Sequence, residues 1–166
     1  MSSDNADVNE QDLGAIADLL ETIRDFFSYC LDERIFYKIV DEATGDVDTD
    51  PTWVVDRDII RRGVVASKRI LESVITQCRD GTVDEETRQK IKIYNLKADH
   101  SKLEQIIFKR IFGKLRDAYS RGIDIKKWLM KAFKAVNIII DSLKLAFPPL
   151  EVTKELKDHF ANLTED

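Results

Sequence analysis

The spacing of apolar residues constrains this chain most, because it follows a helical period over almost the whole length. Between residues 10 and 31 the apolar positions lie three or four apart: Leu13, Ile16, Ala17, Leu20, Ile23, Phe27, Cys30 and Leu31. Such spacing places the side chains on one face of a helix. Similar patterns predict helices over 51–79, 82–98, 101–121 and 125–147, and a last one after Pro149 to about residue 162. Short connections between such helices favour antiparallel neighbours, so we expect an all-α fold, a five- or six-helix antiparallel bundle.

Capping residues predict where several of these helices begin. Thr82-x-x-Glu85 and Ser101-x-x-Glu104 have the pattern of a capping box, in which the first side chain bonds a free backbone N–H. Asp50-Pro51 suits a helix start, although a start after a break near Asp56 is also compatible with the sequence. Asp124 is expected to cap the helix that follows it.

Glycine and proline predict where helices end. Gly81 and Gly122 can take the left-handed conformation that terminates a helix, and Pro148-Pro149 interrupt the pattern that begins near residue 125. Residues 34–40 fit either a further helical turn or two or a short strand, and residues 41–50 read as a loop.

For two further helices we predict which residues face the core. For 101–121 the expected inward residues are Leu103, Ile106, Ile107, Ile111, Leu115 and Ala118. For 125–147 they are Ile125, Trp128, Leu129, Ala132, Phe133, Val136, Ile139, Ile140, Leu143 and Phe147. Because residues 136–140 are apolar nearly all round, we expect the second of these helices to be central.

The length of 166 residues is that of one domain, which we place at 10–166 after a disordered acidic tail at 1–9. We find no secretory signal, lipidation motif or bilayer-spanning run. Cys30 and Cys78 lie on apolar sides of expected helices and read as buried free thiols. These features favour a cytoplasmic protein.

Charge is distributed unevenly along the chain. Residues 1–60 hold 16 acidic and 4 basic side chains, whereas residues 61–146 hold 20 basic and 10 acidic ones. The acidic third could pack beside the basic middle, the basic middle could face an anionic partner, or both could be solvated helix faces. The candidate anion-binding residues are Arg61, Arg62, Lys68, Arg69, Lys109, Arg110, Lys114, Lys127, Lys131 and Lys134.

Motifs for catalysis or for metal and nucleotide binding are absent from the sequence. Asp46-x-Asp48-x-Asp50 resembles the start of a calcium loop, but Pro51 and Arg57 stand where that loop needs glycine and glutamate. The pairs His100/Glu104 and Glu155/His159 lack an evident third ligand for zinc. No nucleophile elbow or phosphate loop is present, so we expect no catalytic, cofactor or metal residues and no enzyme activity.

Three functions stay open at this point. The leading hypothesis is a helical protein–protein interaction module, an adaptor or regulatory subunit with another protein as its partner. The first alternative is a binder of anionic surfaces, either acidic lipid or nucleic acid, through the basic face on residues 61–146. The second alternative is a small helical enzyme or metal carrier.

Overall fold

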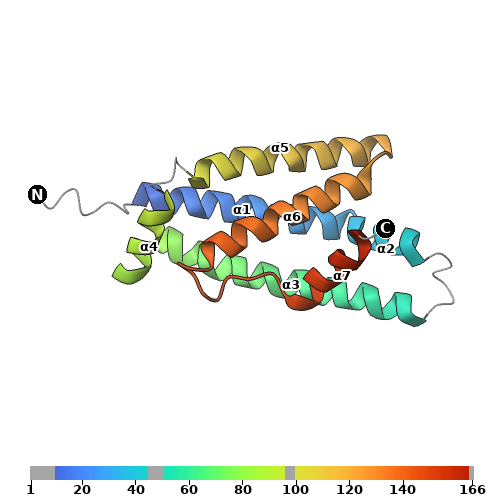
Figure 1. Cartoon of the computed structure of the whole chain (residues 1–166), viewed down its shortest axis with the longest axis horizontal. Coiled ribbons are helices and arrows are strands. Elements are labelled where there is room, and N and C mark those ends of the chain that lie inside the picture. Colours follow the sequence, from blue (N-terminus) through green and yellow to red (C-terminus); the bar gives the residue numbers. More distant parts are fainter. Residues whose placement is uncertain (1–9, 45–50, 96–99, 165–166) are drawn as a thin grey trace, which may run out of the picture.

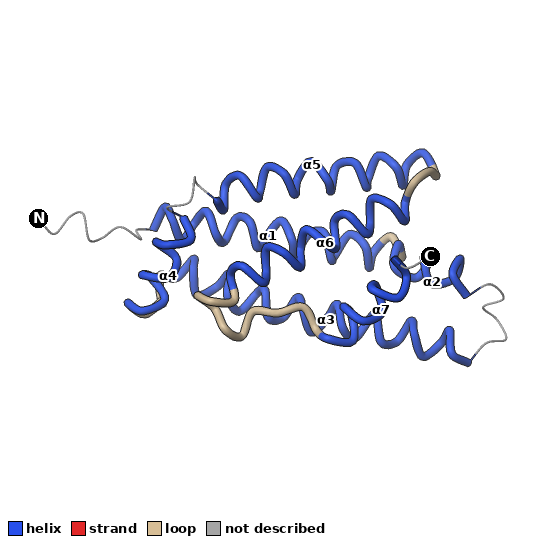
Figure 2. Tube along the Cα trace, viewed as in Figure 1, coloured by secondary structure: helices blue, strands red, loops and turns tan. Residues whose placement is uncertain are grey.

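The computed structural model describes residues 10–44, 51–95 and 100–164, and these residues contain seven α-helices and no strand (Figure 2). In chain order the helices are α1 (Glu10–Asp32), α2 (Ile35–Thr44), α3 (Pro51–Asp80), α4 (Glu85–Asn95), α5 (His100–Arg121), α6 (Ile125–Leu143) and α7 (Lys154–Thr164). The predicted all-α bundle is confirmed, but the described residues form seven helices where five or six were expected, because the ambiguous segment 35–44 is a helix of its own. The expected tail at 1–9 and the aspartates at 46–50 lie outside the described residues.

The ambiguous segment after α1 is helical. Ile35, Phe36 and Ile39 are buried, a spacing that one face of a helix provides. Arg34 has a left-handed backbone (φ 56°) and separates α1 from α2. The helix continues to Thr44, so residues 41–44 are not the loop that we expected.

Both glycine-terminated helix ends are confirmed. Gly81 (φ 69°) follows α3, and the N–H of Thr82 donates to the carbonyl of Gln77 at 3.1 Å. Gly122 (φ 71°) follows α5, and the N–H of Ile123 donates to Ala118 at 3.0 Å. Each bond closes the last helical turn onto a carbonyl that would otherwise lack a partner.

The capping box predicted at Thr82 is wrong. Helix α4 begins at Glu85, and the side chain of Asp84 caps it by accepting the N–H of Thr87 at 2.7 Å. That hydrogen bond lowers the pKa of Asp84, as expected for an acceptor that is favoured in its charged form. Thr82 is already used in the turn that ends α3.

The cap predicted for α5 is wrong, and the cap predicted for α6 is right in position but lacks the side-chain bond. Helix α5 begins at His100, so Ser101 lies inside the helix, where it is buried. Asp124 is the N-cap residue of α6, but its backbone is left-handed (φ 51°) and its side chain makes no capping bond.

Helix α1 is the centre of the bundle. It packs against α2, α3, α4 and α5, and Figure 1 shows α3 and α5 on opposite sides of it. Besides its predicted stripe it buries Leu19 and Phe26, which widens its apolar surface towards both neighbours. The ring of Phe26 lies 5.5 Å from that of Phe108 and 5.8 Å from that of Phe112.

Helix α6 is not central, contrary to our expectation. It pairs with α5 through the short connection 122–124 and is buried along one face only. Its predicted inward residues are buried except Trp128, which is half-buried. The opposite face is exposed and includes Ile138. The apolar segment 136–140 is therefore not enclosed by other helices on all sides. The helix ends at Leu143, before the prolines.

One apolar core contains residues from all seven helices. Helix α3 approaches the segment before α7 closely at Gly63. A Cβ atom there would lie 3.0 Å from Thr153 Oγ1 and 3.2 Å from Leu156 Cβ. Gly63 therefore permits a contact that any larger residue would push apart.

Ionic contacts also join the acidic first helix to the basic middle of the chain. Arg79, near the end of α3, bonds the carboxylates of Asp18 and Glu21 on α1, the latter at 2.7 Å. These partners raise the pKa of the Arg79 guanidinium. The packing of acidic against basic segments, one of the three readings of the charge pattern, therefore occurs at this position.

Candidate functional site

The ten predicted anion-binding residues do not form one surface. Four of them lie on α3 and six lie on α5 and α6. Because α3 and α5 occupy opposite sides of α1, the two groups are separated by the bundle itself (Figure 1). The two groups therefore have different surroundings.

The α3 group consists of Arg61, Arg62, Lys68 and Arg69 and has the features of an ordinary helix face. Arg62 forms an ion pair with Asp58 at 2.9 Å, one turn earlier. It also lines a shallow cavity of about 330 Å³ between α3 and α7 that contains Glu155. Lys68 is half-buried. This group is partly neutralised and offers no concentrated positive charge.

Lys109 faces acidic residues of α1. A cavity of about 490 Å³ between α1 and α5 is lined by Asp25 and Asp32 on one side and by Lys109 and Arg116 on the other. Arg116 also stacks over the ring of Phe112, 4.8 Å from its centre. Charges of both signs line this cavity, so the surroundings of Lys109 are mixed in charge.

Three of the five remaining cations converge on Trp128. The ammonium groups of Lys131, Lys127 and Lys114 lie 4.7, 5.5 and 5.8 Å from the centre of its ring. Lys114 comes from α5 and the other two from α6, so the hairpin brings them together. We call Trp128 with these three lysines the Trp128 cluster. None of the three lysines forms an ion pair with a carboxylate in the described part of the chain.

The start of α6 adds to this positive charge. Its first turn contains Lys126 and Lys127 and no acidic residue. A helix N-terminus already has a partial positive charge, so lysines there reduce the stability of the helix. Across α5 and α6, residues 100–143 hold ten basic and four acidic side chains. The arrangement therefore concentrates positive charge on this hairpin.

The outer face of α5 corrects our prediction for its inward residues. Leu103, Ile106 and Ile107 are 49%, 56% and 46% exposed, although we expected them in the core. Leu115 and Ala118 are buried as predicted, and Ile111 is half-buried. We call Leu103, Ile106 and Ile107 the α5 ridge, because they lie on the side of the helix opposite to its buried residues.

A competing apolar stripe explains this error. Phe108, Phe112 and Leu115 also have helical spacing and take the core positions, where the two rings reach Phe26 of α1. Burying two phenylalanines removes more apolar area from water than burying isoleucines at the same positions. Large residues on both sides of α5, starting with the consecutive Ile106, Ile107 and Phe108, were the available signal for a second face.

The ridge and the cluster belong to one continuous surface. Leu103, Ile107, Arg110 and Lys114 follow one another at spacings of four, three and four and therefore share a face of α5. Arg110 is exposed and forms no ion pair within the described residues. From Ile107 to Lys114 the helix rises by about 10 Å.

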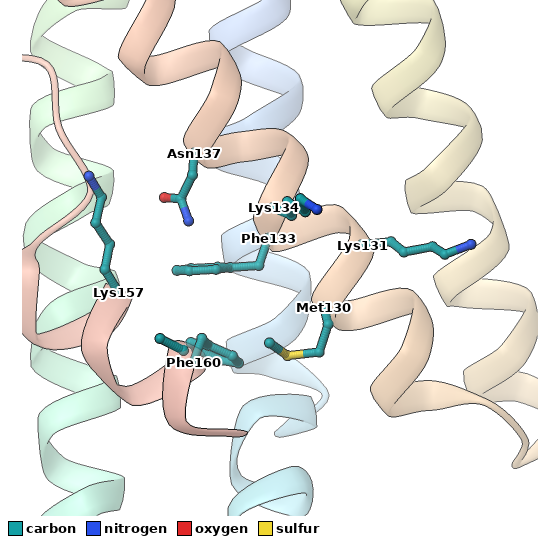
Figure 3. Close-up of a pocket in the computed structure, with 8 residues that line it drawn as sticks. Met130, Lys131, Phe133, Lys134, Asn137, Lys157 and Phe160 are labelled. Carbon is teal, nitrogen blue, oxygen red and sulfur yellow. The ribbon is translucent and has the colours of Figure 1, made fainter. Parts of the chain in front are cut away.

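A small cavity of about 390 Å³ opens between α6 and α7 (Figure 3). Its floor is the stacked pair Phe133 and Phe160, whose ring centres are 4.5 Å apart. Lys131 and Lys134 line it, but in Figure 3 Lys131 extends away from Phe133 towards α5. Lys157 extends on the other side and its Nζ lies 3.7 Å from Asp141 Oδ1. The lysines therefore do not converge on a bound anion in this cavity.

Catalytic and metal chemistry has little support in the described residues. No group of three or more His, Cys, Asp or Glu side chains there could hold a metal ion. Both cysteines are buried and free, as predicted, and burial raises the pKa of the Cys78 thiol to about 12. Such thiols are poor nucleophiles because the thiolate is disfavoured.

Among the described residues, Glu104 is the carboxylate whose pKa is strongly raised. Burial raises it to about 7, and Nδ1 of His100 lies 3.7 Å from Oε1 of Glu104. A perturbed acid can serve a reaction when it lies in a cleft with partner groups. None of the three cavities described above is lined by Glu104.

Comparison with known proteins adds no assignment. No protein family matches the chain, and neither a curated protein nor a solved structure does. None of the helices in the described part of the chain combines the length and the apolar character that crossing a bilayer requires.

Proposed function

We propose that this protein is a helical interaction module without catalytic activity, and that it binds an anionic partner through the outer face of α5 and α6. The observation that carries this proposal is the Trp128 cluster. Three ammonium groups within 5.8 Å of one indole ring form a concentration of charge that no described carboxylate neutralises.

The composition of this surface supports binding better than it supports stability. The three lysines repel one another, and the contacts with the indole contribute only about 0.5–1 kcal/mol each at an exposed site. Lysines in the first turn of α6 oppose the helix dipole. A bound external anion would offset both the repulsion between the lysines and their unfavourable interaction with the helix dipole.

The proposed binding surface is smaller than the basic face on residues 61–146 that we predicted from the sequence. Arg110, Lys114, Lys127, Lys131 and Lys134 remain in it. Lys109 and the α3 group are left out because they face acidic residues, are half-buried or lie across the bundle. An adaptor or regulatory role in the cytoplasm is part of this proposal.

Retention on immobilised heparin and on immobilised polyglutamate tests the proposal directly. The full chain should be retained by at least one of them at low ionic strength and should elute with salt, since the attraction is screened. Lys127→Gln/Lys131→Gln should elute at clearly lower salt, whereas Arg61→Gln/Arg69→Gln on α3 should elute with the wild type. Equal loss in both variants would show that only net charge matters and would contradict the proposed surface.

A further inference from the structure

The α5 ridge gives the proposed surface a second property besides its charge. Its three side chains are about half exposed, and of the seven large apolar residues that are exposed in the described part of the chain, five belong to α5, α6 or their connection. Since isolated exposed apolar residues are common, the grouping on consecutive turns is the informative feature. The ridge ends at Ile107, one turn before Arg110 and two turns before Lys114.

We infer that the α5 ridge and the Trp128 cluster together bind the surface of an anionic lipid bilayer. The inference rests on the proposed function and names its partner. Helix α5 lies parallel to the membrane, the ridge enters the boundary between headgroups and acyl chains, and the lysines contact the headgroups. This is the arrangement of an interfacial amphipathic helix, with apolar tips flanked by cations and a tryptophan near the headgroups.

The shape of the surface favours a bilayer over an acidic protein. The ridge lies on the side of α5 that faces away from α1 and the core, so its side chains project outwards. None of the three cavities described above is lined by Leu103, Ile106 or Ile107. A partner helix needs a groove that matches its shape, whereas a fluid interface adapts to a projecting ridge.

The charge of the surface also fits a lipid headgroup layer. Its cations are four lysines and Arg110, spread along two helices without a described acidic partner. Each lysine near an anionic membrane strengthens binding about fivefold. The net charge of the whole chain, −5, opposes approach only weakly, because repulsion beyond about 8 Å is screened at physiological salt. Local charge therefore decides how the protein docks.

Flotation with lipid vesicles tests this inference on the full chain. Vesicles of phosphatidylcholine alone are compared with vesicles that also contain phosphatidylserine. The protein should float with the anionic vesicles, should bind the neutral ones far less, and should be released when salt is raised to about 1 M.

A ridge variant separates insertion from simple charge attraction. Ile106→Gln/Ile107→Gln should weaken partitioning into anionic vesicles at least about tenfold, because two large aliphatic side chains no longer enter the interface. Val65→Gln, which removes an exposed apolar residue from α3, should leave partitioning unchanged. Circular dichroism of each variant checks that the helices are intact, and heparin retention should be the same for the ridge variant and the wild type.

The outcomes of this experiment are distinct. Loss of vesicle binding in the ridge variant, with Val65→Gln unaffected, supports the inference. Equal vesicle binding by wild type and ridge variant overturns it, because insertion would then contribute nothing. Retention by polyglutamate without vesicle binding also overturns it, and would indicate an acidic protein partner while the proposed function stands. Binding to neither vesicles nor polyanions would overturn both.

Discussion

The ammonium group of Lys131 lies 4.7 Å from the centre of the Trp128 ring, one turn further along α6. The same ring receives Lys114 from α5 at 5.8 Å. A half-buried indole with cations from two helices reports the electrostatic potential of this surface, because its fluorescence responds to ions that approach it.

We therefore predict that quenching of Trp128 depends on the charge of the quencher. In a Trp53→Phe background, where Trp128 is the only tryptophan, iodide should quench more than caesium by a factor of about two or more. Stern–Volmer constants at low salt measure the difference, and acrylamide serves as the neutral reference. Lys127→Gln/Lys131→Gln should remove most of it. Equal quenching by the two ions in the unmodified surface would argue against a positive potential there.

Gly63 and Gly113 should respond to alanine in opposite directions. At Gly63 an added methyl meets Thr153 and Leu156, so we expect Gly63→Ala to lower the free energy of unfolding by about 1–3 kcal/mol. At Gly113, inside α5, no atom lies within 4 Å of an added Cβ. Gly113→Ala should therefore raise the free energy of unfolding by about 0.5–1 kcal/mol. Urea denaturation of both variants gives the comparison. A stabilised Gly63→Ala protein would mean that α3 and α7 are less tightly packed than described.

Glu104 should make the stability of the protein depend on pH. Burial raises its pKa from 4.5 to about 7, so between these values the folded chain holds a proton that the unfolded chain releases. The free energy of unfolding therefore falls as pH rises through this range, and the contribution of Glu104 stays low above it. Glu104→Gln removes the effect and should be more stable than wild type by about 1–3 kcal/mol at pH 8, with little difference at pH 4.

Glu86 provides the control for this experiment. It is exposed and pairs with Lys90 at 3.4 Å on the surface of α4. The difference in stability between Glu86→Gln and wild type should change little with pH over the range in which the Glu104 effect develops. If Glu104→Gln gave the same difference at pH 4 and pH 8, the side chain would not be desolvated in the folded protein.

The two thiols should be protected in the folded protein. Cys30 and Cys78 are buried, and burial raises the pKa of both, that of Cys30 well above its usual range. We expect Ellman's reagent to react with neither in the native state at pH 8 and with both once urea unfolds the chain. Rapid reaction of one thiol without denaturant would identify a local opening of α1 or α3.

The sequence by itself determined most of the helical segments and where several of them end, but it left residues 35–44 open between helix, strand and loop. The hydrogen bonds at Gly81 and Gly122 join residues five positions apart, so a short window contains the whole interaction. The inward face of α6 was also predictable from the sequence. Lysines at 127, 131 and 134 mark the outer side of that helix, which leaves the opposite stripe for the core.

Only the tertiary structure decided which face of α5 is buried. Both of its sides are apolar, so periodicity permits either, and the choice depends on Phe26, which lies some eighty residues earlier in the chain. The two aromatic rings that reach Phe26 are buried, and the aliphatic residues on the other side remain in water. The Trp128 cluster has the same origin, because Lys114 reaches the indole from a different helix. Helical periodicity is a local property, whereas the choice between two apolar faces depends on the neighbours with which each face can pack.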